Sequence, residues 1–99
     1  MRLTVTLYAM FRADVGRRTV TVDVGAERPT VADALACLER EHPELSGRLL
    51  VDGEVPTTVT VLHDGRLVDR ERPEVITLEP GDELSLAPPV TGGSSGRDR

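Results

Sequence analysis

The chain has 99 residues, which is enough for one compact domain built around a single core. Its net charge is −5, all twelve basic residues are arginines, and the only large aromatic residues are Tyr8 and Phe11. This composition provides neither a basic face nor a stacking platform for nucleic acid, and the same charge disfavours anionic membranes.

Alternating residues predict two half-buried strands at the start of the chain. Apolar and polar side chains alternate over residues 2–8 and again over residues 19–24. A turn is expected around Asp14 to Gly16. The two strands are therefore predicted to form an N-terminal hairpin.

The next segment predicts a helix from Val31 to about His42. Four apolar residues within it share one helical face, and Asp33 lies three residues after Thr30, the expected N-cap. Pro43 should end the helix, because the residue before a proline disfavours the helical region.

Residues 44–56 read as irregular, and three more strands are expected after them. They are predicted at Thr58 to Leu62, in a short segment near Leu67 and Val68, and at Glu83 to Leu86. Turns at residues 63–66 and 80–82 separate these strands.

This order of elements predicts an α+β fold. One apolar helix stripe and several half-apolar strands fit a mixed sheet of four to five strands with one main helix packed across it, whereas a closed barrel is disfavoured. The domain is predicted to cover residues 1–87, with residues 88–99 as a flexible tail. The predicted core includes Val5, Val22, Leu35, Leu38, Val61 and Leu84.

The sequence lacks the common motifs of catalysis and cofactor binding. We find no phosphate-binding loop, dinucleotide fingerprint, nucleophile elbow or paired-histidine zinc motif. No bound cofactor is expected, and the chain is predicted to be a carrier or a non-catalytic subunit rather than an enzyme. The sequence opens on the first strand pattern without a charged and apolar leader, so the expected location is the cytoplasm.

Individual reactive side chains have simpler structural interpretations. Cys37 is the only cysteine, which excludes an internal disulfide, and its mid-helix position predicts a packed thiol. Together with His42 and His63 it would give three metal ligands scattered over three elements, so no metal site is predicted. His63 is expected in a turn, and the acidic pair Asp82 and Glu83 is expected to be solvated.

The residues that follow the last strand differ from the rest of the chain. Pro88-Pro89-Val90-Thr91-Gly92-Gly93 combines prolines that favour an extended backbone with two glycines that lack a Cβ. Such a tail can pass through a narrow channel and be gripped by another enzyme. A plain flexible linker would have the same composition, and the residues alone leave both interpretations open.

The chain resembles the MoaD/ThiS family of ubiquitin-like sulfur carriers, which includes the small subunit of molybdopterin synthase and the small archaeal modifier proteins. The resemblance covers residues 3–93, and its most specific part is Gly81-Asp82-Glu83-Leu84-Ser85-Leu86-Ala87 followed by the tail. Residues 7–16 and 30–45 resemble the family's first strand and its helix.

This resemblance implies a β-grasp fold and a covalent cycle on the tail. An ATP-dependent enzyme of the ubiquitin-activating type would adenylate the carboxylate of Gly93, and sulfur would then replace the adenylate. Gly92 and Gly93 would be the covalent carrier, and Pro88, Pro89, Val90 and Thr91 would contact the partners. A sulfur-accepting enzyme, such as a molybdopterin synthase large subunit, would take the sulfur.

The chain departs from the family pattern after Gly93, where members usually end. Residues 94–99 follow here, so Gly93 has no free carboxylate in the full chain. The extension is interpreted as a precursor segment that a trimming protease removes. A relative that has lost the chemistry, or a cloning remnant, would leave the same sequence.

Three functions thus remain open from the sequence. The first is a sulfur carrier for molybdenum cofactor or a related thiolation pathway. The second is a ubiquitin-like modifier joined to lysines of target proteins, and the third is a β-grasp interaction module that carries nothing. The absence of lysine from the chain fits either of the first two.

Overall fold

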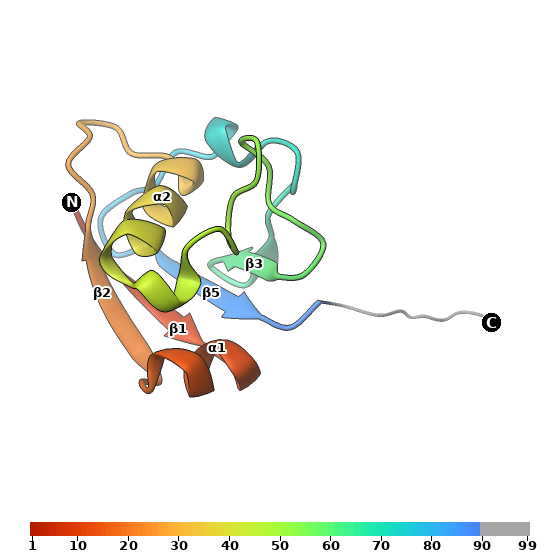
Figure 1. Cartoon of the computed structure of the whole chain (residues 1–99). Helices are drawn as coiled ribbons and strands as arrows, with labels where there is room; N and C mark the ends of the chain where they lie inside the picture. The colour runs from red at the N-terminus through yellow and green to blue at the C-terminus, as the bar shows by residue number, and fades with distance from the viewer. Residues whose placement is uncertain (90–99) are drawn as a thin grey trace.

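The computed structural model describes residues 1–89, and a mixed five-stranded sheet forms its centre (Figure 1). The strands are ordered β2-β1-β5-β3-β4, with β1 and β5 parallel and the other neighbours antiparallel. Their bounds are β1 Arg2–Leu7, β2 Thr19–Asp23, β3 Thr60–His63, β4 Arg66–Leu67 and β5 Glu83–Ala87. One longer helix packs across one face, so the predicted α+β, β-grasp fold is confirmed.

The long helix α2, Val31–Glu41, begins and ends within one residue of its prediction. Thr30 is the N-cap, and its hydroxyl accepts a hydrogen bond from the Asp33 N–H while the Asp33 carboxylate accepts one from the Thr30 N–H. This capping box pairs two donors that the first helical turn leaves free. After His42 the chain enters a single 3₁₀ turn, η1 Pro43–Leu45.

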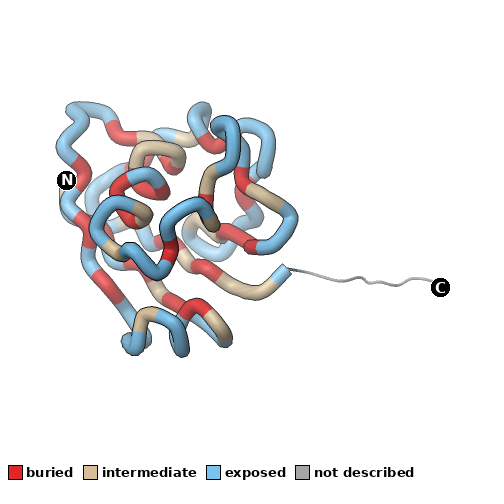
Figure 2. The backbone as a smooth tube through the Cα atoms, in the orientation of Figure 1, coloured by how far each residue is buried: buried red, intermediate tan, exposed pale blue. Residues whose placement is uncertain are grey.

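The core lies between α2 and the sheet face that the helix covers (Figure 2). Alternate strand residues point into it, as the period of two predicted. All six side chains that we expected in the core are buried, namely Val5, Val22, Leu35, Leu38, Val61 and Leu84.

The N-terminal hairpin differs from its prediction. β1 and β2 pair antiparallel as expected, but the connection contains a short helix, α1 Ala9–Val15, where only a turn was predicted. Phe11 on α1 is 1% exposed and fixes the helix to the core. Gly16 then ends the helix at φ +84°, a left-handed conformation that glycine adopts without strain.

The second half of the chain follows the predicted order with shifted ends. β3 starts two residues later and ends one residue later than expected, and β4 lies one residue earlier. A second 3₁₀ turn, η2 Pro73–Val75, packs against α2 and was not predicted. β5 ends at Ala87, although the division into a domain and a tail at that residue stays a prediction. No helix within residues 1–89 is both long and apolar enough to cross a membrane.

Candidate functional site

The candidate site is the end of β5, where the chain leaves the sheet. β5 is the middle strand, parallel to β1 on one side and antiparallel to β3 on the other. Leu84 and Leu86 are fully buried and anchor it to the core. The sheet therefore holds the base of the tail on both sides.

Two hydrogen bonds fix the direction in which the chain leaves. The Tyr8 N–H donates to the carbonyl oxygen of Leu86 at 3.0 Å, and the Thr60 hydroxyl donates to the carbonyl oxygen of Pro88 at 2.9 Å. Thr60 is 8% exposed and is the only polar residue among the buried side chains of residues 1–89. Its hydroxyl thus has a partner at the exit from the sheet, as a buried polar group requires.

The structure places part of the predicted tail at this exit. Pro88 is half-buried and Pro89 is exposed. Val90, Thr91, Gly92 and Gly93 lie outside the described residues, so their predicted roles stay predictions. Thr60, by contrast, was not predicted, because its partner lies 28 residues away and no local pattern marks the contact.

An apolar surface lies beside the exit on the face of the sheet that α2 leaves open. Leu62 pairs with Leu67 across β3 and β4, and Ala87 pairs with Thr60 across β5 and β3. Leu67 is 71% exposed, and Leu62 and Ala87 are half-buried. We call Leu62, Leu67 and Ala87 the outer-sheet patch; the sequence predicted the strands but not this surface.

The reactive side chains of the described region lie elsewhere. His63, at the far end of β3 from Thr60, hydrogen-bonds through Nε2 to Asp82 Oδ2 at 2.8 Å, and Asp64 Oδ2 is 3.7 Å from the same nitrogen. The Glu79 N–H also donates to Asp82 Oδ2. These hydrogen bonds, that from His63 first, hold the pKa of the Asp82 carboxyl below its usual range.

Two expectations about these side chains are therefore corrected. Asp82 is a half-buried, hydrogen-bonded carboxylate rather than a solvated one, and His63 is the last residue of β3 rather than a turn residue. His63 and Asp82 are 19 residues apart in the sequence, so only the tertiary fold brings them together.

The scattered ligands considered from the sequence do not form a group. Within residues 1–89, the histidine, cysteine and carboxylate atoms that gather closely enough to hold a metal are those of His63, Asp64 and Asp82. Cys37 is 6% exposed in the core, where the Arg40 guanidinium donates to its sulfur at 3.2 Å. The prediction of a packed thiol is confirmed.

Comparison with known proteins decides the family. The model of the ThiS family matches residues 5–93, which is most of the chain and includes both glycines of the tail. The chain belongs to the ThiS family. Residues 94–99 lie beyond the matched region, which agrees with the expectation that the family pattern ends at Gly93.

Comparisons with individual proteins agree with this assignment. The chain is 41% identical over 93 residues to small archaeal modifier protein 3 of Haloferax volcanii, covering 94% of this chain and 100% of the relative. It is 40% identical over 88 residues to small archaeal modifier protein 1 of the same organism, covering 88% and 95%. The crystal structure of SAMP1 from Haloferax volcanii superposes with a TM-score of 0.75 at 37% identity, covering 94% of this chain and all of that one. The predicted membership among ubiquitin-like sulfur carriers and modifiers is confirmed.

Proposed function

We propose that this ThiS-family protein carries sulfur on the carboxylate of Gly93 after an ATP-dependent enzyme of the ubiquitin-activating type has adenylated it. The observation that carries the proposal is the fixed exit of the chain at Thr60 and Pro88, directly ahead of a family match that ends at Gly93. A strand held on both sides, followed in the sequence by two prolines that favour an extended backbone and then by two glycines, suits a tail on which another enzyme acts.

The chemistry needs little from the carrier beyond this tail. An oxygen of the Gly93 carboxylate attacks the α-phosphate of ATP, pyrophosphate leaves, and an acyl adenylate remains. Hydrosulfide then attacks the acyl carbon, the acyl–phosphate bond breaks and AMP leaves, and loss of the remaining proton gives a thiocarboxylate. In this scheme the activating enzyme binds the ATP, so the carrier itself holds no cofactor and performs no catalysis. Because the cycle needs ATP, its proposed location is the cytoplasm.

Residues 94–99 must be removed before this cycle can start. A peptide carbonyl has no nucleophilic oxygen comparable to a carboxylate, so Gly93 can be adenylated only after the bond to Ser94 is cut. A trimming protease is therefore part of the proposal, as for ubiquitin-type precursors.

The outer-sheet patch is the proposed contact surface for the partners. Leu67 is largely exposed and pairs with Leu62, which in turn pairs with Ser85, two residues before the end of β5. Exposed apolar residues grouped beside a functional segment mark protein interaction sites. The activating enzyme and then the sulfur-accepting enzyme, such as a molybdopterin synthase large subunit, would use it in turn.

A second function, protein modification, is favoured by a specific observation. Both relatives reported above are named small archaeal modifier proteins and match nearly the whole chain. The same acyl adenylate would then react with a lysine amine of a target protein. Because the chain itself contains no lysine, its copies cannot be joined through lysine side chains, and single additions are expected.

The adenylation step can be tested with three purified proteins. They are the chain ending at Gly93, the full chain, and the chain ending at residue 93 with Gly93→Ala. With the activating enzyme and ATP, we expect adenylate and then thiocarboxylate only on the first, detected by intact mass. The Gly93→Ala chain should melt at the same temperature as its parent, because Gly93 belongs to none of the apolar stripes that the sequence assigns to the core.

Equal failure of the chain ending at Gly93 and the full chain would support the non-carrying interaction module instead. Adenylation of the untrimmed full chain would contradict the need for a free Gly93 carboxylate.

A further inference from the structure

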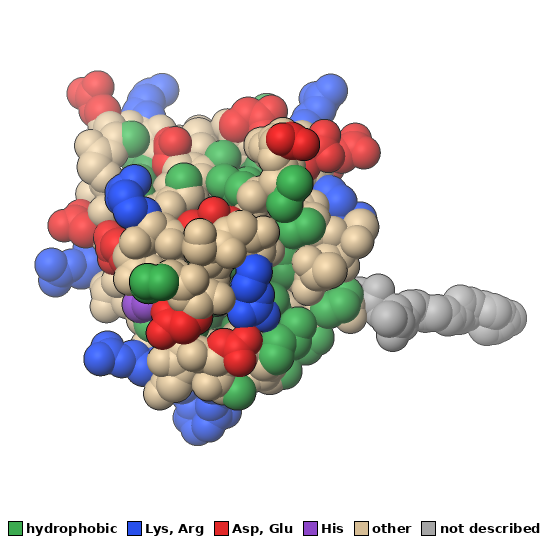
Figure 3. Space-filling view, in the orientation of Figure 1, with side chains coloured by type: hydrophobic (Ala, Val, Ile, Leu, Met, Phe, Trp, Pro, Cys, Tyr) green, Lys and Arg blue, Asp and Glu red, His purple; other side chains and the backbone are tan. Residues whose placement is uncertain are grey.

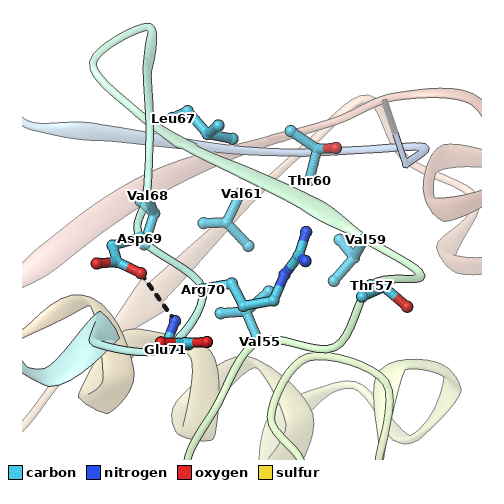
Figure 4. Close-up of a pocket in the computed structure, with 10 residues that line it drawn as sticks. All are labelled: Val55, Thr57, Val59, Thr60, Val61, Leu67, Val68, Asp69, Arg70 and Glu71. Atoms are coloured by element: carbon cyan, nitrogen blue, oxygen red, sulfur yellow. Dashed lines mark hydrogen bonds between the residues drawn. The ribbon is translucent and has the colours of Figure 1, made fainter. Parts of the chain in front are cut away.

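A hollow of about 670 Å³ lies at the edge of the sheet, between β3 and the chain that follows β4 (Figure 4). A backbone hydrogen bond closes each end of it. The Val68 N–H donates to the Val61 carbonyl at 2.9 Å, and the Val55 N–H donates to the Arg70 carbonyl at 2.8 Å. Between these two bonds the segments 55–61 and 67–71 separate, and we call this space the edge groove.

The floor of the edge groove is apolar and its rim is charged. Four buried valines line the inner part, namely Val55, Val59, Val61 and Val68. Exposed Thr57, Asp69 and Glu71 stand at the rim. A groove of this kind accepts an apolar side chain whose neighbours remain at the charged edge.

The charges around the groove favour a cationic partner. Residues 52–89 contain nine acidic residues and three arginines, whereas residues 1–51 contain seven of each. The net negative charge of the described chain therefore belongs to the half that forms the groove. In Figure 3, acidic side chains lie at the upper right of the molecule with basic side chains among them. Complementary charge on a partner would speed its association with this half.

A second hollow of about 440 Å³ extends the edge groove. It shares Val55, Thr57 and Arg70 with the first and adds Asp52 and Glu54 to the rim. Arg70 makes no ion pair and no side-chain hydrogen bond with residues 1–89, and it points across the first hollow in Figure 4. The four carboxylates of the combined rim outnumber it, so the rim stays negative.

The edge groove is continuous with the site at the end of β5. Thr60 lines the groove and also donates its hydroxyl to Pro88, and Leu67 belongs to both the groove and the outer-sheet patch. A protein that holds the tail and covers the patch therefore reaches the groove without a gap.

We propose that the edge groove is a docking site for a segment of the activating enzyme that inserts an apolar side chain flanked by Lys or Arg. This inference rests on the proposed function, because it takes the activating enzyme as the partner. The valine floor accounts for the apolar insert, and the carboxylates of Asp69, Glu71, Asp52 and Glu54 account for the flanking cations.

The test is the affinity of the full chain for the adenylating enzyme of the source organism, measured with two matched pairs of variants. Thr57→Trp fills the groove, whereas Thr58→Trp places the same side chain on the neighbouring exposed residue outside it. Glu71→Arg reverses a rim charge, whereas Glu74→Arg makes the same change on an exposed residue of the same acidic half outside the groove.

We expect Thr57→Trp to raise the Kd at least fivefold and Thr58→Trp to leave it within twofold. Glu71→Arg should slow association and flatten its dependence on salt more than Glu74→Arg does. Melting temperatures of all four variants check that they fold, and amide shifts of residues 55–61 and 67–71 on adding enzyme give an independent readout.

Equal effects within each matched pair would overturn the docking site. The proposed function is judged separately by Gly93→Ala: if that change abolishes adenylation while the pairs behave alike, the groove proposal alone fails. If the chain ending at Gly93 is itself not adenylated, the proposed function fails.

Discussion

The carboxylate oxygen Oδ2 of Asp82 accepts hydrogen bonds from both the His63 ring and the Glu79 N–H. This one atom joins the end of β3 to the turn that precedes β5. The Asp64 carboxylate adds a parallel tie, since its Oδ1 accepts the N–H of Glu83 at 2.9 Å. The start of β5 is thus held by two acidic side chains, as its end is held by Thr60.

We predict that Asp82→Asn lowers the melting temperature at neutral pH. The pKa of Asp82 in the folded chain lies below its unfolded value of 3.8, so the stabilisation is complete above that unfolded pKa and is lost as the pH falls through the lower folded value. The difference in melting temperature between Asp82→Asn and the parent should shrink as the pH is lowered from neutral to about 2. Asp52→Asn, on an exposed residue without a described side-chain hydrogen bond, is the control and should show no gap. A gap that stays constant over this range would contradict the assigned role.

At the scale of elements, the exit of β5 depends on a side chain of β3. Thr60→Val keeps the shape of the side chain and removes the hydroxyl that donates to the Pro88 carbonyl oxygen. We expect the kcat/KM of adenylation, measured on the chain ending at Gly93, to fall roughly fivefold, since one hydrogen bond is worth about 1 kcal/mol and the tail loses its fixed direction. The loss of stability should stay within about 1 kcal/mol, because the Pro88 carbonyl lies on a half-buried residue that water reaches.

Thr58→Val provides the control for this substitution, because Thr58 is exposed and donates no described side-chain hydrogen bond. If Thr60→Val and Thr58→Val were adenylated equally well, the hydrogen bond to Pro88 would have no part in presenting the tail.

Local patterns predicted the elements whose signals lie within one turn or one strand. The Thr30 and Asp33 capping box fixed the start of α2, and the period of two fixed which valines and leucines face the core. The helix α1 was missed because seven residues are too few for an apolar period to emerge, and Gly16, its actual C-cap, also fits a turn. Its burial depends on Phe11, which packs only once the sheet has formed.

The contacts that shape the candidate site could not be predicted, because they join distant residues. Thr60 and Pro88, His63 and Asp82, and the two sides of the edge groove are each set by the pairing of β3 with β5 and β4. The tail motif itself was read directly from the sequence, but its glycines lie outside the described residues.

At the scale of the whole molecule, the fold separates a stable body from a segment on which chemistry is proposed. The sheet and α2 bury the apolar residues, while the exit of β5, the outer-sheet patch and the edge groove adjoin one another on the β3 side. Four of the nine acidic residues in 52–89 line the groove on that side, namely Asp52, Glu54, Asp69 and Glu71. A single partner can therefore contact all three features at once.

The central claim is that the working form of the protein ends at Gly93 and carries sulfur there. Its most direct test is the intact mass of the protein purified from its native cells under non-reducing conditions. We expect a chain that ends at Gly93, with a fraction in which one carboxylate oxygen is replaced by sulfur. Finding every molecule with residues 94–99 still attached would contradict it.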